Sequence, residues 1–231
     1  MTWSALLFAA TSGKLFLAGG GTTPPDLEDR FIKECGGPEG LIVVMPLASA
    51  EPEKTKGSVE LLEKHGAKNL FFFGRSKPST DDLEELRGKL ATARGIWMPG
   101  GQQHRIVERL TKPWIDANLV PRVKAGMHVY GTSAGAMVCA EVMITGPGKE
   151  PDTAETAPGF GLTSFVVDTH FAQRKREGRL RHALKSAERT KGVGINEREW
   201  IVIQDDKIVE RHGTPLVIEL SRAFRPRALS R

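Results

Sequence analysis

The most constraining feature of this sequence is an alternation between short, continuous apolar runs and longer polar-rich stretches. The apolar runs are Lys14–Ala18, Leu41–Leu47, Asn69–Phe73, Gly95–Met98 and Met127–Tyr130. Runs of this kind are typical of strands buried on both faces, and the stretches between them are long enough for the helices that join parallel strands. The alternation therefore predicts an α/β fold with a mostly parallel sheet between two layers of helices.

The polar-rich stretches carry helix signals. Three helices are predicted, at Asp26–Cys35, Lys54–His65 and Asp81–Leu90. In the third, leucines recur every three or four residues after Ser79, a residue type that often caps helices. These segments fit the helical layers of the predicted sandwich.

The pattern changes after Leu162. We predict a strand at Ser164–Val167, a helix at Arg174–Glu188, and strands at Val193–Ile195, Trp200–Gln204, Lys207–Arg211 and Leu216–Leu220. Asp205-Asp206 is typical of a hairpin turn, so the C-terminal part is predicted to extend the sheet with antiparallel strands. The segment Gly146–Phe160, which contains several Pro and Gly residues, is predicted to be a long surface loop.

Length and composition indicate one globular domain. The chain has 231 residues, of which 39% are hydrophobic and 26% charged, so residues 1–231 are predicted to form a single domain, with an N-terminal extension at 1–12 and a loose basic tail at 222–231. The excess of 33 basic over 28 acidic residues is too small to require a nucleic-acid partner. The sequence contains no run of about 18 apolar residues, which is the length that would predict a membrane-spanning helix.

The two cysteines bear on the compartment. Cys35 and Cys139 form neither a disulfide framework nor a zinc-ligand cluster, which favours two buried thiols in a reducing compartment. We therefore predict a cytoplasmic protein. Secretion is the alternative, because the chain starts with a short apolar stretch, although no basic residues precede it.

A glycine-rich turn follows the apolar run at Met127–Tyr130. Gly131-Thr132-Ser133-Ala134-Gly135 has the G-x-S-x-G pattern of a nucleophile elbow, and Met137–Met143 after it has helical character. Such an elbow lifts a serine hydroxyl above the sheet, and the amide of the next residue can bind a developing oxyanion. Ser133 is thus the candidate nucleophile and the Ala134 N–H a candidate oxyanion donor. The alternative is a packing turn in which Ser133 caps the helix.

A second glycine turn, Gly100-Gly101, follows the run at Gly95–Met98 and precedes an amphipathic segment. Carboxyl ends of parallel strands gather at one edge of a sheet, so both turns are predicted to face one crevice. Gly101 could then supply the second oxyanion N–H, and Gln103 an amide for substrate. A purely structural turn is the alternative. Gly19-Gly20-Gly21 lacks the spacing of a nucleotide-binding loop and is interpreted as a simple turn.

Six histidines compete for the role of general base. His170 is the strongest candidate because it follows the apolar run Phe165–Val167, at the carboxyl end of a predicted strand. His104, near the second glycine turn, is its main competitor. Position alone leaves this choice open, since a single histidine in such a place is more often structural.

The residues around His170 carry a longer pattern. The segment from Asp168 to Leu180 closely resembles the D-x-H-F-x-x-R-x-R-x-x-R-L signature of cyanophycinases and their relatives, the S51 serine peptidases. The elbow, Gly100–Gln103 and Gly192–Glu197 resemble motifs of the same family, in the same order. The resemblance implies a class I glutamine-amidotransferase-like, flavodoxin-like α/β/α sandwich. It also implies a Ser–His–Glu catalytic triad made of Ser133, His170 and Glu197.

The resemblance further implies a serine peptidase that forms an acyl-enzyme with aspartyl-linked peptides. Cyanophycin, β-aspartyl-arginine and, in the dipeptidase E branch, α-aspartyl dipeptides are the substrates that it suggests. The family's substrate-binding positions correspond to Gln103, Asp168, Thr169, Arg174, Arg176 and Arg179. Arginine pairs well with carboxylates, and Asp168 could pair with a guanidinium. Gln102 and Thr169 depart from the family's usual residues, which concerns the substrate pocket more than the triad.

The expected partner is an aspartyl peptide, and the expected assembly is a homodimer. Neither a metal, a cofactor, a nucleic acid nor a membrane is expected. One alternative is a serine esterase of α/β-hydrolase type, with Ser133, Asp205 or Asp206, and His212 in that order. Another is a non-catalytic protein that holds acidic polymers on its basic helix.

Overall fold

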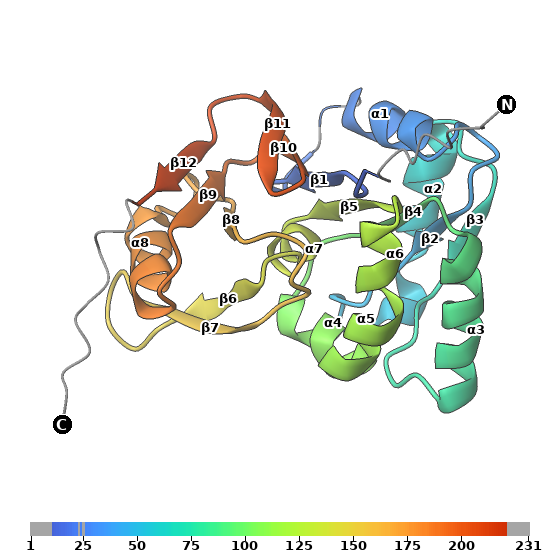
Figure 1. Ribbon diagram of the computed structural model, residues 1–231, viewed down its shortest axis with the longest axis horizontal. Coiled ribbons are helices and arrows are strands. Elements are labelled where there is room, and N and C mark those ends of the chain that lie inside the picture. The colour runs from blue at the N-terminus through green and yellow to red at the C-terminus, as the bar shows by residue number, and fades with distance from the viewer. Residues whose placement is uncertain (1–10, 23, 25, 221–231) are drawn as a thin grey trace, which may run out of the picture.

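A computed structural model describes residues 11–22, 24 and 26–220, so nearly all of the predicted N-terminal extension and the whole basic tail lie outside the described residues. Its largest element is a seven-stranded sheet with the order β11-β10-β1-β5-β4-β2-β3 (Figure 1). The strands are β1 (Leu15–Ala18), β2 (Ile42–Val44), β3 (Leu70–Phe72), β4 (Gly95–Met98), β5 (His128–Thr132), β10 (Trp200–Gln204) and β11 (Lys207–His212). Strands β1 to β5 are parallel, whereas β10 runs antiparallel to both β1 and β11. The predicted α/β class is confirmed.

Helices cover both faces of this sheet (Figure 1). One face packs against α1 (Asp26–Glu34) and α2 (Gly57–Lys64), and the other against α3 (Thr80–Thr92), α4 (Gln103–Leu110), α5 (Lys112–Asn118) and α6 (Val120–Lys124); a single 3₁₀ turn, η1 (Pro52–Lys54), precedes α2. Alternate strand residues enter different cores: Phe16 joins the α1 side and Leu17 the opposite side. Strands β1, β2 and β4 are therefore buried and free of polar side chains throughout, which produced continuous runs in the sequence.

A smaller lobe follows β5. It contains the one-turn helix α7 (Ala134–Met137), the hairpin of β6 (Val142–Pro147) and β7 (Ala154–Pro158), the helix α8 (Glu177–Ser186), and a sheet of order β12-β9-β8. Strands β8 (Val166–Thr169) and β9 (Lys191–Ile195) are parallel, and β12 (Leu216–Glu219) is antiparallel to β9. The predicted antiparallel extension of the main sheet is therefore correct for β10 and β11 only.

Two local predictions in this lobe are wrong. The segment predicted as a helix, Met137–Met143, leaves helical conformation after Met137 because the carbonyls of residues 138, 139 and 140 accept the N–H groups of residues 160, 162 and 161. The segment predicted as a loop, Gly146–Phe160, contains most of the β6–β7 hairpin. In both cases pairing with a distant segment overrides the local signal.

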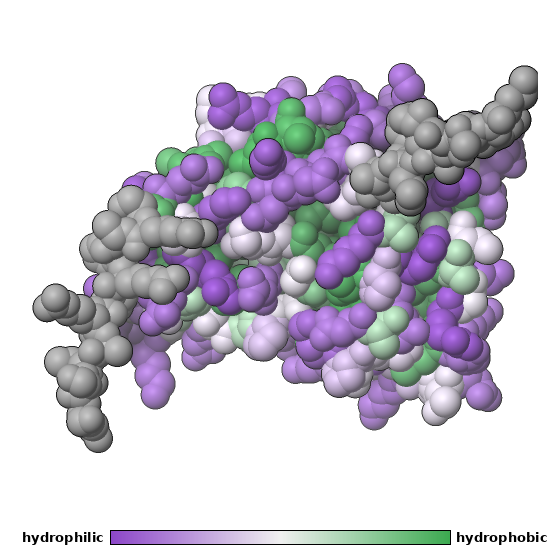
Figure 2. All heavy atoms as spheres, in the orientation of Figure 1, coloured by the Kyte–Doolittle hydropathy of each residue, from purple (hydrophilic) through white to green (hydrophobic). Residues whose placement is uncertain are grey.

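The visible face in Figure 2 is mostly hydrophilic, with apolar residues gathered toward its centre and over β11. No helix among the described residues is long and apolar enough to cross a membrane. Both cysteines are buried thiols, and burial raises the pKa of each well above its ordinary value.

Candidate active site

Ser133 lies on a strained turn between β5 and α7. Its φ of 53° and ψ of −112° are rare for a residue with a side chain. The flanking glycines are required by close packing: a Cβ on Gly131 would lie 2.3 Å from the Gly135 carbonyl oxygen, and one on Gly135 would lie 1.9 Å from the Met98 carbonyl oxygen. The Ser133 side chain makes no capping bond to α7, so the helix-cap alternative finds no support.

A chain of two hydrogen bonds leads away from Ser133. The Oγ of Ser133 lies 2.9 Å from the Nε2 of His170, whose Nδ1 lies 2.7 Å from the Oε1 of Glu197. The His170 side chain is 14% exposed and the Glu197 side chain 37%, so the imidazole is sheltered while the carboxylate reaches solvent. Nucleophile, base and orienting acid require this connectivity. The structure thus brings together the three residues, while their catalytic roles stay a prediction.

The end of β1 joins the three segments that carry these side chains. Three consecutive carbonyls accept one N–H each: Ala18 from Ser133 at 3.0 Å, Gly19 from His170 at 2.8 Å, and Gly20 from Arg198, next to Glu197, at 3.0 Å. Because β1 lies between β5 and β10, both of its neighbours hold this end in place.

Sequence reasoning missed the importance of Gly20 and Gly21. Both have positive φ, 99° and 71°. A Cβ on Gly20 would lie 2.3 Å from Cε1 and 2.5 Å from Nε2 of His170, and one on Gly21 would lie 3.2 Å from Cβ of Glu197. The backbone of this turn therefore forms one wall of the imidazole site. The available signal was three glycines at the carboxyl end of a predicted buried strand.

Two side chains fasten the loops of His170 and Glu197 to each other. Asn196 Oδ1 accepts the N–H of Ala172 at 3.0 Å, and Gln173 Oε1 accepts the N–H of Glu197 at 3.1 Å. The loop after β8 and the loop after β9 are thus connected by two hydrogen bonds besides the imidazole–carboxylate contact.

The Gly100-Gly101 turn faces the elbow, as predicted. A Cβ on Gly100 would lie 3.4 Å from the Cβ of Ser133 and 3.8 Å from its Oγ. Gly101 has a φ of 141°, and a Cβ there would lie 2.3 Å from the Ala48 carbonyl oxygen. Gly101 and Ala134 as oxyanion donors remain a prediction.

Gln103 is the first residue of α4, and its side chain turns into the protein. It is 8% exposed, and its Nε2 donates to the carbonyl of Ile144 and lies 3.4 Å from that of Thr145. The amide nitrogen expected to contact substrate is therefore used to hold β6.

Asp168 and Thr169, at the end of β8, are both completely buried. Asp168 accepts two hydrogen bonds from Arg179, at 2.7 and 2.5 Å, and one from Nη1 of Arg176 at 3.4 Å. The Thr169 Oγ1 lies 3.2 Å from the sulfur of Met137. Neither residue presents its side chain at the surface of the site.

The three predicted arginines differ in exposure. Arg174 is exposed, whereas the side chains of Arg176 and Arg179 are 15% and 11% exposed. Burial lowers the pKa of Arg176 to about 10, against the opposing effect of Asp168, so the guanidinium stays charged at neutral pH. Arg174 is thus the predicted substrate-binding residue that most fully reaches solvent.

The other histidines make contacts of their own. His65 pairs with Asp29, His128 accepts the N–H of Lys14, His182 accepts that of Ala154, and His212 stacks on Trp200. Burial lowers the pKa of His128. His104, the competing base, is half-buried on α4, while the hydroxyl of Ser133 meets His170.

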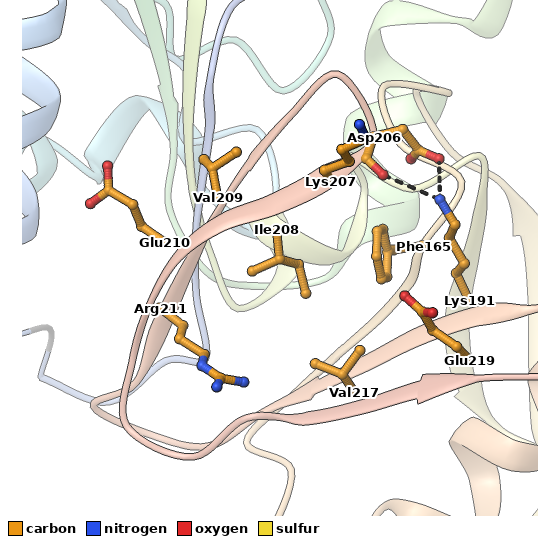
Figure 3. A pocket seen from close by; sticks show the side chains of 10 residues that line it. All are labelled: Phe165, Lys191, Asp206, Lys207, Ile208, Val209, Glu210, Arg211, Val217 and Glu219. Carbon is orange, nitrogen blue, oxygen red and sulfur yellow. Dashed lines mark hydrogen bonds and ion pairs between the residues drawn. The ribbon is translucent and has the colours of Figure 1, made fainter.

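The acids of the alternative esterase triad lie elsewhere. Asp206 accepts hydrogen bonds from Ser164 and Lys191, and it lines a pocket beside β11 together with Lys191 and Phe165 (Figure 3). Asp205 accepts the hydroxyl of Ser12. Among the described residues, the esterase constellation is not assembled around Ser133.

Comparison with known sequences adds an independent finding. A family model for peptidase family S51 matches residues 15–211. The cyanophycinase of Geminocystis herdmanii (strain PCC 6308) is 31% identical over 192 residues, covering 80% of this chain and 71% of that protein. That of Trichormus variabilis is 30% identical over 183 residues, covering 76% and 61%. Peptidase E of Streptomyces coelicolor is 27% identical over 133 residues, covering 52% and 53%.

Solved structures share the fold. A peptidase from an acI-B1 Actinobacterium aligns with a TM-score of 0.67 at 18% identity, covering 92% of this chain and 98% of that chain. A putative peptidase E from Listeria monocytogenes aligns with a TM-score of 0.61 at 18% identity, covering 91% and 100%. At this identity the likeness concerns the fold alone, and it agrees with the flavodoxin-like sandwich.

Proposed function

The chain belongs to peptidase family S51, and on that premise we propose that it is a serine-type peptidase that cleaves aspartyl-linked peptides through an acyl-enzyme. The observation that carries the proposal is the continuous contact from the Ser133 hydroxyl through His170 to Glu197, at 2.9 and 2.7 Å. Each residue comes from a different segment, and the strained elbow serves no capping purpose.

The first half-reaction uses all three side chains. His170 Nε2 takes the Ser133 proton as the serine oxygen attacks the scissile carbonyl carbon, and Glu197 holds Nδ1–H and stabilises the imidazolium. The carbonyl oxygen becomes an oxyanion, for which the N–H groups of Ala134 and Gly101 are the proposed donors. His170 then protonates the departing amine, which leaves an acyl group on Ser133.

The second half-reaction repeats this chemistry with water. His170 removes a proton from a water molecule as it attacks the acyl carbonyl, and then returns a proton to the Ser133 oxygen as the acid product leaves. Hydrolysis is complete and the triad returns to its starting state.

Exposed cations near the triad support an acidic substrate. Arg174 and Lys175 follow His170 in the chain, and Arg198 follows Glu197; all three are exposed. Guanidinium groups bind carboxylates in paired geometry, which suits the free carboxylates of aspartyl peptides. The matched cyanophycinases point in the same direction, so cyanophycin, an arginine-decorated poly-aspartate, and β-aspartyl-arginine are the first substrates to test.

A second candidate is an α-aspartyl dipeptidase. The match to the peptidase E of Streptomyces coelicolor favours it. The same triad would serve, and the two candidates differ only in which aspartyl bond reaches Ser133.

The test has two parts. First, the protein is treated with a fluorophosphonate probe, which reacts with activated serines. Second, cyanophycin, β-aspartyl-arginine and α-aspartyl dipeptides are incubated in parallel, and mass spectrometry of the products identifies the bond that is cut. We expect probe labelling and release of an aspartyl product in at least one arm.

Two variants control this test. Ser133→Ala should lose labelling and turnover while keeping its thermal unfolding midpoint. Ser186→Ala, whose hydroxyl bonds within α8, removes an equivalent group and should keep both activities. Turnover by folded Ser133→Ala, or failure of the wild-type protein both to label and to cleave any arm, would refute the proposal.

A further inference from the structure

The buried ion cluster behind His170 consists of Asp168, Arg176 and Arg179. Asp168 has no exposed surface, and both of its carboxylate oxygens accept hydrogen bonds from Arg179. A carboxylate in this state is unavailable to a ligand unless the ion pair breaks, and breaking a buried pair is strongly unfavourable. The carboxylate of Asp168 and the guanidinium of Arg179 therefore bind each other.

The cluster also binds both backbone groups of Thr169, the residue before His170. The Thr169 N–H donates to Asp168 Oδ1 at 2.9 Å, and the Thr169 carbonyl accepts from Arg176 Nη1 at 2.7 Å. With these two bonds, the peptide groups on either side of Thr169 have fixed orientations. The base is thus preceded by a residue whose backbone is clamped by charged side chains.

His170 needs such support because its own backbone is strained. Its φ is 49°, in the left-handed region that residues with a side chain rarely adopt. Strain of this kind persists only where contacts with the surrounding structure hold the backbone in that conformation. In the peptide group between Thr169 and His170, the N–H donates to the Gly19 carbonyl and the carbonyl accepts from Arg176.

We propose that Asp168, Arg176 and Arg179 are positioning residues that hold His170 against Ser133, and that Arg174 alone among the four acts on substrate. This inference rests on the proposed function. It differs from the sequence-based assignment, which gave all four residues to substrate binding, and it predicts that their substitutions affect different steps.

The experiment compares two readouts in each variant. One is the rate of fluorophosphonate labelling, which requires the Ser133–His170 contact but no aspartyl recognition. The other is kcat and KM for the aspartyl substrate identified above. The main variant is Arg176→Gln, because it leaves the Asp168–Arg179 pair intact while it removes the bond to the Thr169 carbonyl and the longer, 3.4 Å contact with Asp168. Its expected effect is a fall of about 10-fold to 100-fold in both labelling and kcat, with KM little changed.

Arg181→Gln is the matched control, because Arg181 lies on α8, the helix that begins directly after Arg176, but is exposed and pairs with Glu177. It should label and turn over like the wild-type protein. Arg174→Gln should raise KM and lower kcat/KM for the peptide by more than it lowers labelling. Circular dichroism and thermal unfolding establish that each variant is folded. If Arg176→Gln does not fold, Arg176→Lys keeps the charge and loses the planar fork, and the same comparison applies.

The outcomes are separable. Labelling of Arg176→Gln at the wild-type rate, together with a raised KM, would show that Arg176 binds substrate and would overturn the inference. Absence of both labelling and cleavage in the wild-type protein would instead refute the proposed function. Loss of labelling and kcat in Arg176→Gln but not in Arg181→Gln supports the positioning role.

Discussion

Gly20→Ala tests how the backbone at the end of β1 orients the imidazole. The added Cβ would lie 2.3 Å from Cε1 of His170, whereas ordinary contact begins at 3.4 Å, so ring and backbone must separate by about an ångström. A displacement of that size at a general base costs on the order of 10²-fold in rate. A side chain at a φ of 99° adds about 1 to 3 kcal/mol of backbone strain to the folded state.

The assay must separate the clash from the strain. Gly36→Ala does so, because Gly36 has a similar φ of 94° but no atom within 4 Å of the added Cβ. Both variants should lose stability in urea unfolding through backbone strain, and Gly20→Ala should lose at least as much as Gly36→Ala because of its clash. Only Gly20→Ala should lose fluorophosphonate labelling and kcat, by about 10²-fold. If Gly20→Ala labels as fast as Gly36→Ala, the close approach of the glycine backbone does not orient His170 and the reasoning fails.

Three further predictions concern the acids. Glu197→Gln should lower kcat by about 10²-fold or more while His212→Ala changes nothing; the reverse pattern would restore the esterase alternative. Asp206 is partly desolvated, but hydrogen bonds from Ser164 and Lys191 outweigh this and lower its pKa to about 2. Its stabilising effect should be present above the ordinary pKa of 3.8 and vanish as pH falls through about 2. Since the side chain is 39% exposed, Asp206→Asn should cost only about 1 kcal/mol in urea unfolding at pH 7, with equal stability of the two proteins near pH 2. Burial raises the pKa of Glu28 above 4.5, so wild-type stability should fall as pH rises through the raised value; Glu28→Gln should abolish that fall, and parallel stability–pH curves would contradict it.

The parallel core was predictable from sequence because its signal is local. Strands buried on both faces are apolar at every position, and the residues of β1, β2 and β4 show this plainly. The elbow and the Ser79 cap were predictable for a similar reason, since a strained turn and a capping box each need particular residues at fixed spacing.

The smaller lobe was not predictable in the same way, because its strands depend on distant partners. The β7 segment Ala154–Pro158 has two alanines, a glutamate and a proline, a composition with little strand preference, and it becomes a strand by pairing with β6. The burial of Asp168 was equally hidden. A charged residue is expected at the surface, and only the approach of Arg179 from α8 makes its burial possible.

The end of the central strand β1 determines how the three residues of the proposed triad come together. Its last residue, Ala18, is paired with Thr132 on β5 and Trp200 on β10, so the carbonyls that follow emerge from the most constrained part of the sheet. The carbonyls of Ala18, Gly19 and Gly20 accept the N–H groups of Ser133, of His170 and of Arg198, which is next to Glu197. A site built on a rigid element loses less precision to thermal motion than one built on loops alone. Three segments can meet there only if the residues that follow β1 have no side chains. A Cβ on Gly19 would lie 2.0 Å from the Asn196 carbonyl oxygen, and one on Gly20 would clash with the imidazole of His170. The glycines after β1 therefore allow the three proposed catalytic side chains to meet, although they contribute no reactive group.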